Sequence, residues 1–144
     1  MRLLSTKTLQ LSDFAGHRTP RYAILSHRWG DDEISYHDLR YLVETDENRR
    51  AIIQAVYNVS HQKAEGKGFT KILRACSMAI AQDFEWIWID TCCINKESSS
   101  ELSEAVNSMF KWYNRAEKCY AYLADVKADD GSKNEFQTSD WFRR

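Results

Sequence analysis

Residues 86–95 read WIWIDTCCIN, and this stretch decides the fold class of the chain. An uninterrupted apolar and aromatic run leads directly into Asp90, as in a buried strand Trp86–Asp90 whose carboxyl end carries polar groups. An earlier stretch, Tyr22–Ser26 or YAILS, leads in the same way into His27-Arg28-Trp29-Gly30. Ligands of open α/β sheets bind beyond the carboxyl ends of the strands. We therefore expect both strand ends to border one crevice.

Helical patterns separate and follow these strands. We expect helices over Asp38–Val43, Asn48–Gln62 and Lys71–Gln82, the last capped by Thr70 after a turn at Gly66–Gly68. A further helix runs from Glu101 to Ala116 and leads to a strand over Cys119–Leu123, while residues 1–14 suggest a short edge strand. This alternation predicts an α/β fold of three layers, a mostly parallel sheet flanked by helices.

Two helices show apolar stripes that we expect to pack on the sheet. In the first helix the stripe comprises Ile72, Leu73, Cys76, Ala79 and Ile80. In the second it comprises Leu102, Ala105, Val106, Met109, Phe110, Tyr113 and Ala116.

Composition indicates one ordinary globular domain, residues 1–144, with 43% hydrophobic residues and a net charge of -1. The near-zero charge gives no electrostatic basis for binding nucleic acid. The chain contains no apolar run of membrane-spanning length and no signal peptide, so we expect a cytoplasmic protein whose four cysteines are reduced.

The strand-end residues have a ligand-binding and a structural interpretation. Arg28 can hold a phosphate and Trp29 can stack on a base or ribose. Alternatively, Arg28 is a solvated charge and Trp29 is a core lid, a side chain that covers the hydrophobic core. Asp90 can bind a ribose hydroxyl, or can cap the following loop. Cys92 or Cys93 with His27 would suit a nucleophile–base pair, although free cysteines more often act as small buried hydrophobic residues.

Metal and P-loop chemistry find no support in the spacing. The adjacent cysteines and scattered histidines lack zinc-site spacing, and GKGFTK at residues 66–71 does not match a P-loop.

Two glutamates follow the central strand. Ser98-x-x-Glu101 has the form of a capping box, which gives Glu101 a structural role. Glu104 lies one turn further along, beside the apolar stripe with Ser108 and Lys111, where it can face the crevice or be a solvated glutamate.

YAILSHRWG, WIWIDTCCIN and ELSEAVNSMFKWYNRAEKCYAYLADV occur here in the order that resembles the fungal heterokaryon incompatibility (HET) domain. That domain is similar to the TIR domain, so the resemblance implies a flavodoxin-like sheet. HET domains usually continue past the WFRR that ends this chain, so the last strand and helix of the family fold are expected to be missing, with a sheet edge left open.

The resemblance also implies a function in fungal cell death. Some TIR domains cleave the nicotinamide–ribose bond of NAD⁺ with a glutamate on a helix after a central strand, for which Glu104 is the closest counterpart and Glu101 the fallback. The nucleotide would then contact Ser26, His27, Arg28, Trp29, Asp90 and Cys92. NAD⁺ would be a substrate, with no cofactor or metal and with self-association or other cell-death domains as the trigger. The alternative is a non-catalytic module that signals by docking onto like domains.

Overall fold

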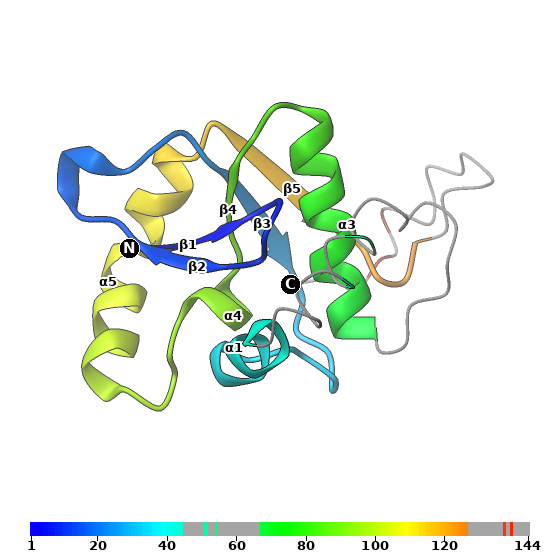
Figure 1. The fold of residues 1–144 in the computed structure, drawn as a ribbon, viewed down its shortest axis with the longest axis horizontal. Coiled ribbons are helices and arrows are strands. Elements are labelled where there is room, and N and C mark those ends of the chain that lie inside the picture. Colours follow the sequence, from blue (N-terminus) through cyan, green and yellow to red (C-terminus); the bar gives the residue numbers. More distant parts are fainter. Residues whose placement is uncertain (45–50, 52–53, 55–66, 127–136, 138, 140–144) are drawn as a thin grey trace.

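The structure is a computed structural model that describes residues 1–44, 51, 54, 67–126, 137 and 139, and the statements below refer to these residues. Its centre is a five-stranded sheet in the order β2-β1-β4-β3-β5 (Figure 1). The strands are β1 (Arg2–Ser5), β2 (Leu11–Asp13), β3 (Ala23–His27), β4 (Trp86–Trp88) and β5 (Lys118–Tyr122).

The sheet is mixed. Strands β4, β3 and β5 run parallel to one another, with β5 at one edge of the sheet, whereas β1 is antiparallel to both β4 and β2. The α/β class is therefore confirmed. The antiparallel part arises because residues 1–14 form a hairpin of two strands that pairs with β4.

The helices connect the strands in chain order. They are η1 (Gly16–Arg18), α1 (Tyr36–Val43), α3 (Lys67–Ala81), α4 (Asp90–Cys93) and α5 (Ser99–Arg115). Helix α1 begins before the expected residue because Ser35 and Asp38 form a complete capping box. The helix expected over residues 48–62 lies outside the described residues, apart from positions 51 and 54.

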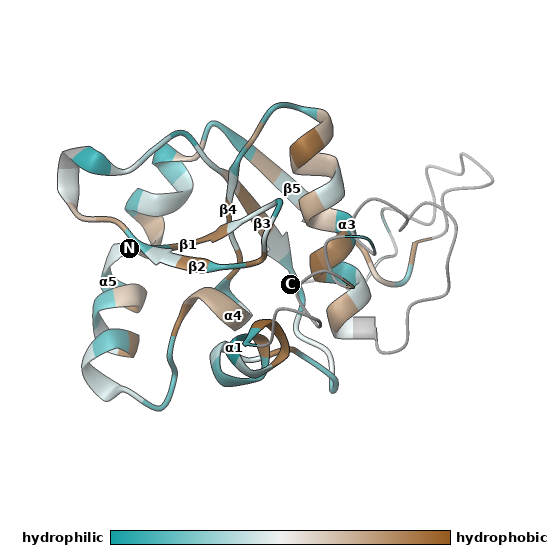
Figure 2. Ribbon diagram, in the orientation of Figure 1, coloured by the Kyte–Doolittle hydropathy of each residue, from teal (hydrophilic) through white to brown (hydrophobic). Residues whose placement is uncertain are grey.

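Helices α3 and α5 cover opposite faces of the sheet. In the strand register Ile24 pairs with Trp88 and the next residue, Leu25, pairs with Tyr120, so Trp88 and Tyr120 belong to different faces. Trp88 packs edge-on against Trp112 of α5, with ring centroids 5.5 Å apart. The Tyr120 hydroxyl donates to the side chain of Gln82, directly after α3. The three layers are thus present, and Figure 2 shows hydrophobic bands on β4 and along α3.

Two further boundaries differ from the expected ones. Thr70 lies inside α3, which begins at Lys67, because the Asp32 carboxylate accepts a hydrogen bond from the Gly68 amide at 3.1 Å and so supplies the acceptor at the helix start. Strand β4 ends at Trp88, and Asp90 begins the helical turn α4 instead of ending the strand.

The apolar stripe expected on α3 is confirmed, whereas that of α5 is only partly buried. Ala105 is buried, and Met109, Trp112, Tyr113 and Ala116 pack against the core. Leu102, Val106 and Phe110 are exposed, because the apolar residues of α5 extend around more of the helix than the side that meets the sheet. Ser98 caps α5 as expected, accepting from the Glu101 amide.

Candidate functional site at the strand ends

The three parallel strands define where a ligand site is expected. The chain passes from β3 to β4 on one side and then crosses back to β5 on the other, which gives the order β4-β3-β5. The first strand of the three therefore lies in the middle, as in flavodoxin-like sheets. The connection after β3 leads to one side of it, and the connection after β4 crosses to the other side, so the direction of the chain reverses at β3. That reversal point is the usual ligand site of an open α/β sheet.

Side chains from β3 and from the segment after β4 meet at this edge. The Trp29 indole N–H donates to Oδ2 of Asp90 at 2.8 Å, and Nε2 of His27 lies 3.6 Å from Oδ1 of the same carboxylate. The structure therefore brings together His27, Trp29 and Asp90. Trp29 is 50% exposed, so it is no core lid. The residue before α4 is Ile89, whose side chain makes no capping bond, and the Asp90 carboxylate bonds to Trp29.

Three charged residues complete the cluster. The Lys71 ammonium pairs with Glu33, and Nε2 of His27 lies 3.8 Å from Oε2 of Glu33. The Lys96 ammonium lies 3.2 Å from the centroid of the Trp29 ring, a cation–π contact. We name these six residues the strand-end cluster: His27, Trp29, Glu33, Lys71, Asp90 and Lys96.

Sequence reasoning missed Glu33, Lys71 and Lys96. One signal was available for Lys71, because a lysine beside Ile72 and one turn before Ala75 occupies the apolar side of α3. Its side chain is only 4% exposed. Glu33 and Lys96 lie in loops, where spacing carries no information about tertiary contacts.

Burial shapes the charge state of the cluster. Burial lowers the pKa of His27, against the raising effect of Asp90, so the imidazole is neutral near pH 7. Both ring nitrogens of His27 are buried and lack a hydrogen-bond partner among the described residues. Burial also lowers the pKa of Lys96, which Asp90 and Glu33 oppose. The cluster is thus a partly desolvated group of charges with unused hydrogen-bonding capacity on His27.

A pocket opens beside Trp29, between the ends of β3 and β5. Its volume is about 270 Å³, and its lining includes Arg28, Trp29 and, after β5, Asp125. It is smaller than most ligand sites, which enclose about 300–1,000 Å³. It can therefore accept one ring or one phosphate of a larger molecule.

The remaining predicted nucleotide contacts lie differently. Ser26 sits within β3 and is partly exposed. Cys92 is fully buried, with its thiol 3.9 Å from the carbonyl oxygen of Ile89. A hydrogen bond with Cys93 and burial raise the pKa of the Cys92 thiol well above its usual range. A protonated thiol in the core is poorly placed for nucleophilic chemistry.

Glu101 has a structural role. Arg2 donates to both of its oxygens, at 2.6 and 3.3 Å, and the Asn95 amide donates to Oε1 at 2.7 Å. Its carboxylate thus reaches Asn95 instead of the Ser98 amide expected for a capping box. Burial opposes ionisation of Glu101, but the bonds from Arg2 and Asn95 outweigh it and hold its pKa below the usual value.

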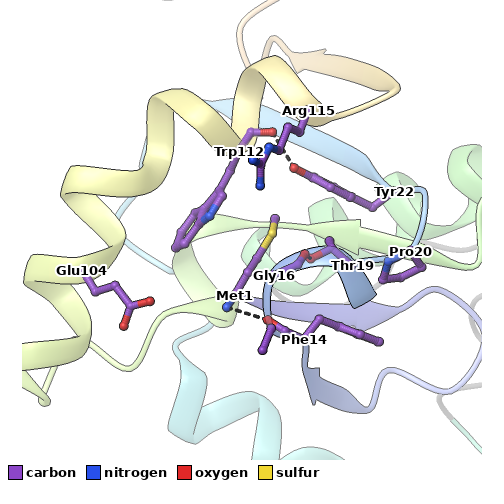
Figure 3. Close-up of a pocket in the computed structure, with 10 residues that line it drawn as sticks. Met1, Phe14, Gly16, Thr19, Pro20, Tyr22, Glu104, Trp112 and Arg115 are labelled. Carbon is purple, nitrogen blue, oxygen red and sulfur yellow. Dashed lines mark hydrogen bonds between the residues drawn. The ribbon is translucent and has the colours of Figure 1, made fainter.

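Glu104 lines a different cavity from the strand-end cluster. This cavity, of about 760 Å³, lies between α5 and the loop before β3, and Trp112 and Arg115 also border it. Figure 3 shows Glu104 and Arg115 extending into it from α5, with Tyr22 donating to the Trp112 carbonyl oxygen at 2.6 Å. None of the predicted nucleotide contacts lines this cavity. The structure therefore separates Glu104 from the predicted nucleotide contacts.

In the described part of the chain, no group of three or more histidine, cysteine, aspartate or glutamate side chains is arranged to hold a metal ion. No described helix is long and apolar enough to cross a membrane.

Comparison with known proteins identifies relatives. The family model described as Heterokaryon incompatibility protein (HET) matches residues 22–144. The vegetative incompatibility protein HET-E-1 of Podospora anserina is 41% identical over 141 residues, which cover 92% of this chain. The matched region spans only 9% of the length of that relative. No solved structure matches the chain.

Proposed function

This chain belongs to the heterokaryon incompatibility (HET) family, and on that premise we propose that it is an effector domain that triggers cell death in an incompatibility reaction. The name of its relative, a vegetative incompatibility protein, supports that role. Because the chain corresponds to a small part of that relative, recognition of the trigger would belong to other parts of such a protein.

We further propose that the chemical output is NAD(P)⁺ glycohydrolysis, the activity implied by the resemblance to TIR domains. The observation that carries this proposal is the meeting of Trp29 and Asp90 at the reversal point of the sheet. Arg28 and the exposed indole of Trp29 line the pocket at this edge, and the Asp90 carboxylate accepts the hydrogen bond of that indole beside it. The indole, the carboxylate and the guanidinium match an aromatic base, a ribose and a phosphate respectively.

The reaction requires little from the protein. The bond between nicotinamide and C1′ of the ribose breaks, nicotinamide leaves with the electron pair, and water adds to the ribosyl cation and loses a proton. Nicotinamide leaves as a neutral base, so no general acid is needed. A fixed carboxylate stabilises such a cation. In the strand-end site Asp90 would supply it, and Arg28 would hold a phosphate.

The competing location is the cavity of Glu104, which is large enough for a whole dinucleotide. It lacks Arg28 and Trp29, and its lining includes Tyr22 and the residues before it, at the amino end of β3. Ligands of open α/β sheets bind at the opposite end of the strands. We therefore assign the nucleotide to the strand-end site, and Glu104 stays a prediction to be tested beside it.

The test is nicotinamide release from NAD⁺, measured by HPLC with the purified chain. The variants are Asp90→Asn, which keeps an acceptor for the Trp29 N–H, and Glu104→Gln, with exposed Glu85→Gln as the matched control. We expect Asp90→Asn to lower turnover by about 100-fold or more, with the other two within twofold of wild type. Circular dichroism checks that each variant is folded.

Other outcomes overturn parts of the proposal. Loss of release with Glu104→Gln alone would place the chemistry in the α5 cavity. Absence of release from the wild type would refute glycohydrolysis by this chain. The second candidate function, a non-catalytic module that docks onto like domains, would then account for the role in incompatibility. The exposed apolar residues of α5 favour that candidate.

A further inference from the structure

Helix α5 carries an apolar surface that its own fold leaves uncovered. Leu102, Val106 and Phe110 are 37%, 63% and 76% exposed, and they follow one another at intervals of four residues. Residues spaced by four form a continuous ridge along a helix. We name these three residues the α5 ridge. Single exposed apolar residues are common on protein surfaces, but a contiguous ridge marks an interaction site.

From this ridge we propose that two copies of the chain associate through α5, which goes beyond the proposed function and gives a surface to the self-association that the family resemblance implies. The ridge is symmetric about its middle residue. A two-fold axis through Val106 brings Leu102 of each copy against Phe110 of the other and Val106 against its own counterpart. The most common class of helix–helix contact in globular proteins packs ridges of this kind on each helix into the grooves of the other. The contact is isologous and therefore closes as a dimer.

The charge pattern favours a second copy over a charged partner. On the solvent side of the ridge, the neighbouring positions are the uncharged Ser103, Asn107 and Asn114, all exposed. The exposed Glu104 and Lys111 lie further round the helix from the ridge than these residues do. An uncharged apolar face is matched by another of the same kind, and an identical copy presents one. The net charge of -1 adds almost no repulsion between copies.

The size of the ridge sets the strength expected. Three partly exposed side chains on each copy make a small interface, well below that of a permanent dimer. The dimer should therefore form at high protein concentration and dissociate on dilution. That behaviour suits a domain whose activity depends on a high local concentration of its copies.

The test is the solution mass measured by sedimentation equilibrium over a range of concentrations. The wild type should rise from 16.9 kDa toward twice that value. Val106→Lys places two ammonium groups against each other on the axis and should weaken dimerisation at least tenfold. Met78→Lys is the matched control, because Met78 is an exposed apolar residue on α3, 50% accessible, and should leave the dimer intact.

A cross-link tests the symmetry. In a Cys119→Ser background, which removes the exposed native thiol, Val106→Cys should give a disulfide-linked dimer under mild oxidation. A wild type that stays at 16.9 kDa at every concentration refutes the proposal. So does a dimer that Val106→Lys leaves unchanged, which would place the interface elsewhere. Because mass is measured without NAD⁺, these results are independent of the glycohydrolase test.

Discussion

Replacing Glu33 with glutamine should destabilise the protein far more than an ordinary surface substitution. The Glu33 carboxylate pairs with Lys71, and the two side chains are 15% and 4% exposed. Removing one partner of a buried pair leaves the other charge without compensation, at a cost of about 3–5 kcal/mol. Glutamine keeps the acceptor that the Gly30 amide uses at 2.8 Å, so the substitution isolates the loss of charge.

The measurement is the free energy of unfolding from urea denaturation. Glu117→Gln is the matched control, because Glu117 pairs with Arg21 at 2.9 Å but the side chains are 53% and 55% exposed. Exposed pairs contribute about 0–1 kcal/mol, so this variant should remain close to wild type. The double variant Glu33→Gln with Lys71→Met removes both buried charges and should recover most of the lost stability.

Two results would refute this reasoning. Equal losses for Glu33→Gln and Glu117→Gln would mean that burial does not distinguish the two pairs. A double variant no more stable than Glu33→Gln would mean that the unpaired Lys71 ammonium is not the source of the cost.

Three further predictions follow from the same part of the molecule and from its thiols. Gly68→Ala should destabilise the fold by several kcal/mol, because the added Cβ would meet the Asp32 carbonyl oxygen at 2.0 Å. Gly30→Ala is the control, since a Cβ at Gly30 meets nothing closer than 3.7 Å. Thermal denaturation of the two variants compares their stabilities. The free energy of unfolding should fall as the pH drops below about 6.5, because His27 takes up a proton in the unfolded chain and resists it in the folded protein. One proton gives a slope of at most about 1.4 kcal/mol per pH unit. A stability–pH profile that does not flatten in His27→Gln would contradict this. Of the four cysteines, only Cys119 is exposed, so a thiol reagent should titrate one group in the native protein and four after denaturation.

Much of the fold follows from local patterns. Apolar runs ending in polar residues marked β3 and β4, and the stripe of α3 marked its buried side. These signals come from residues near one another in the chain, where periodicity reports which side of an element meets the core. The misplaced start of α3 has a different origin. Asp32 provides the acceptor at the start of α3 from 36 residues away, and no local pattern contains that information.

The candidate site likewise combines features that the sequence predicts with features that it does not. The sequence by itself determined that His27, Trp29 and Asp90 follow neighbouring buried strands, and therefore that they meet at one edge of the sheet. Only the tertiary structure decided that Glu33, Lys71 and Lys96 join them, and that Glu104 borders a separate cavity. The physical reason is that burial and ion pairing depend on distances across the fold. Only the tertiary structure decided which side of α5 meets the sheet, because a helix with a wide apolar arc buries only the part of that arc that another layer covers.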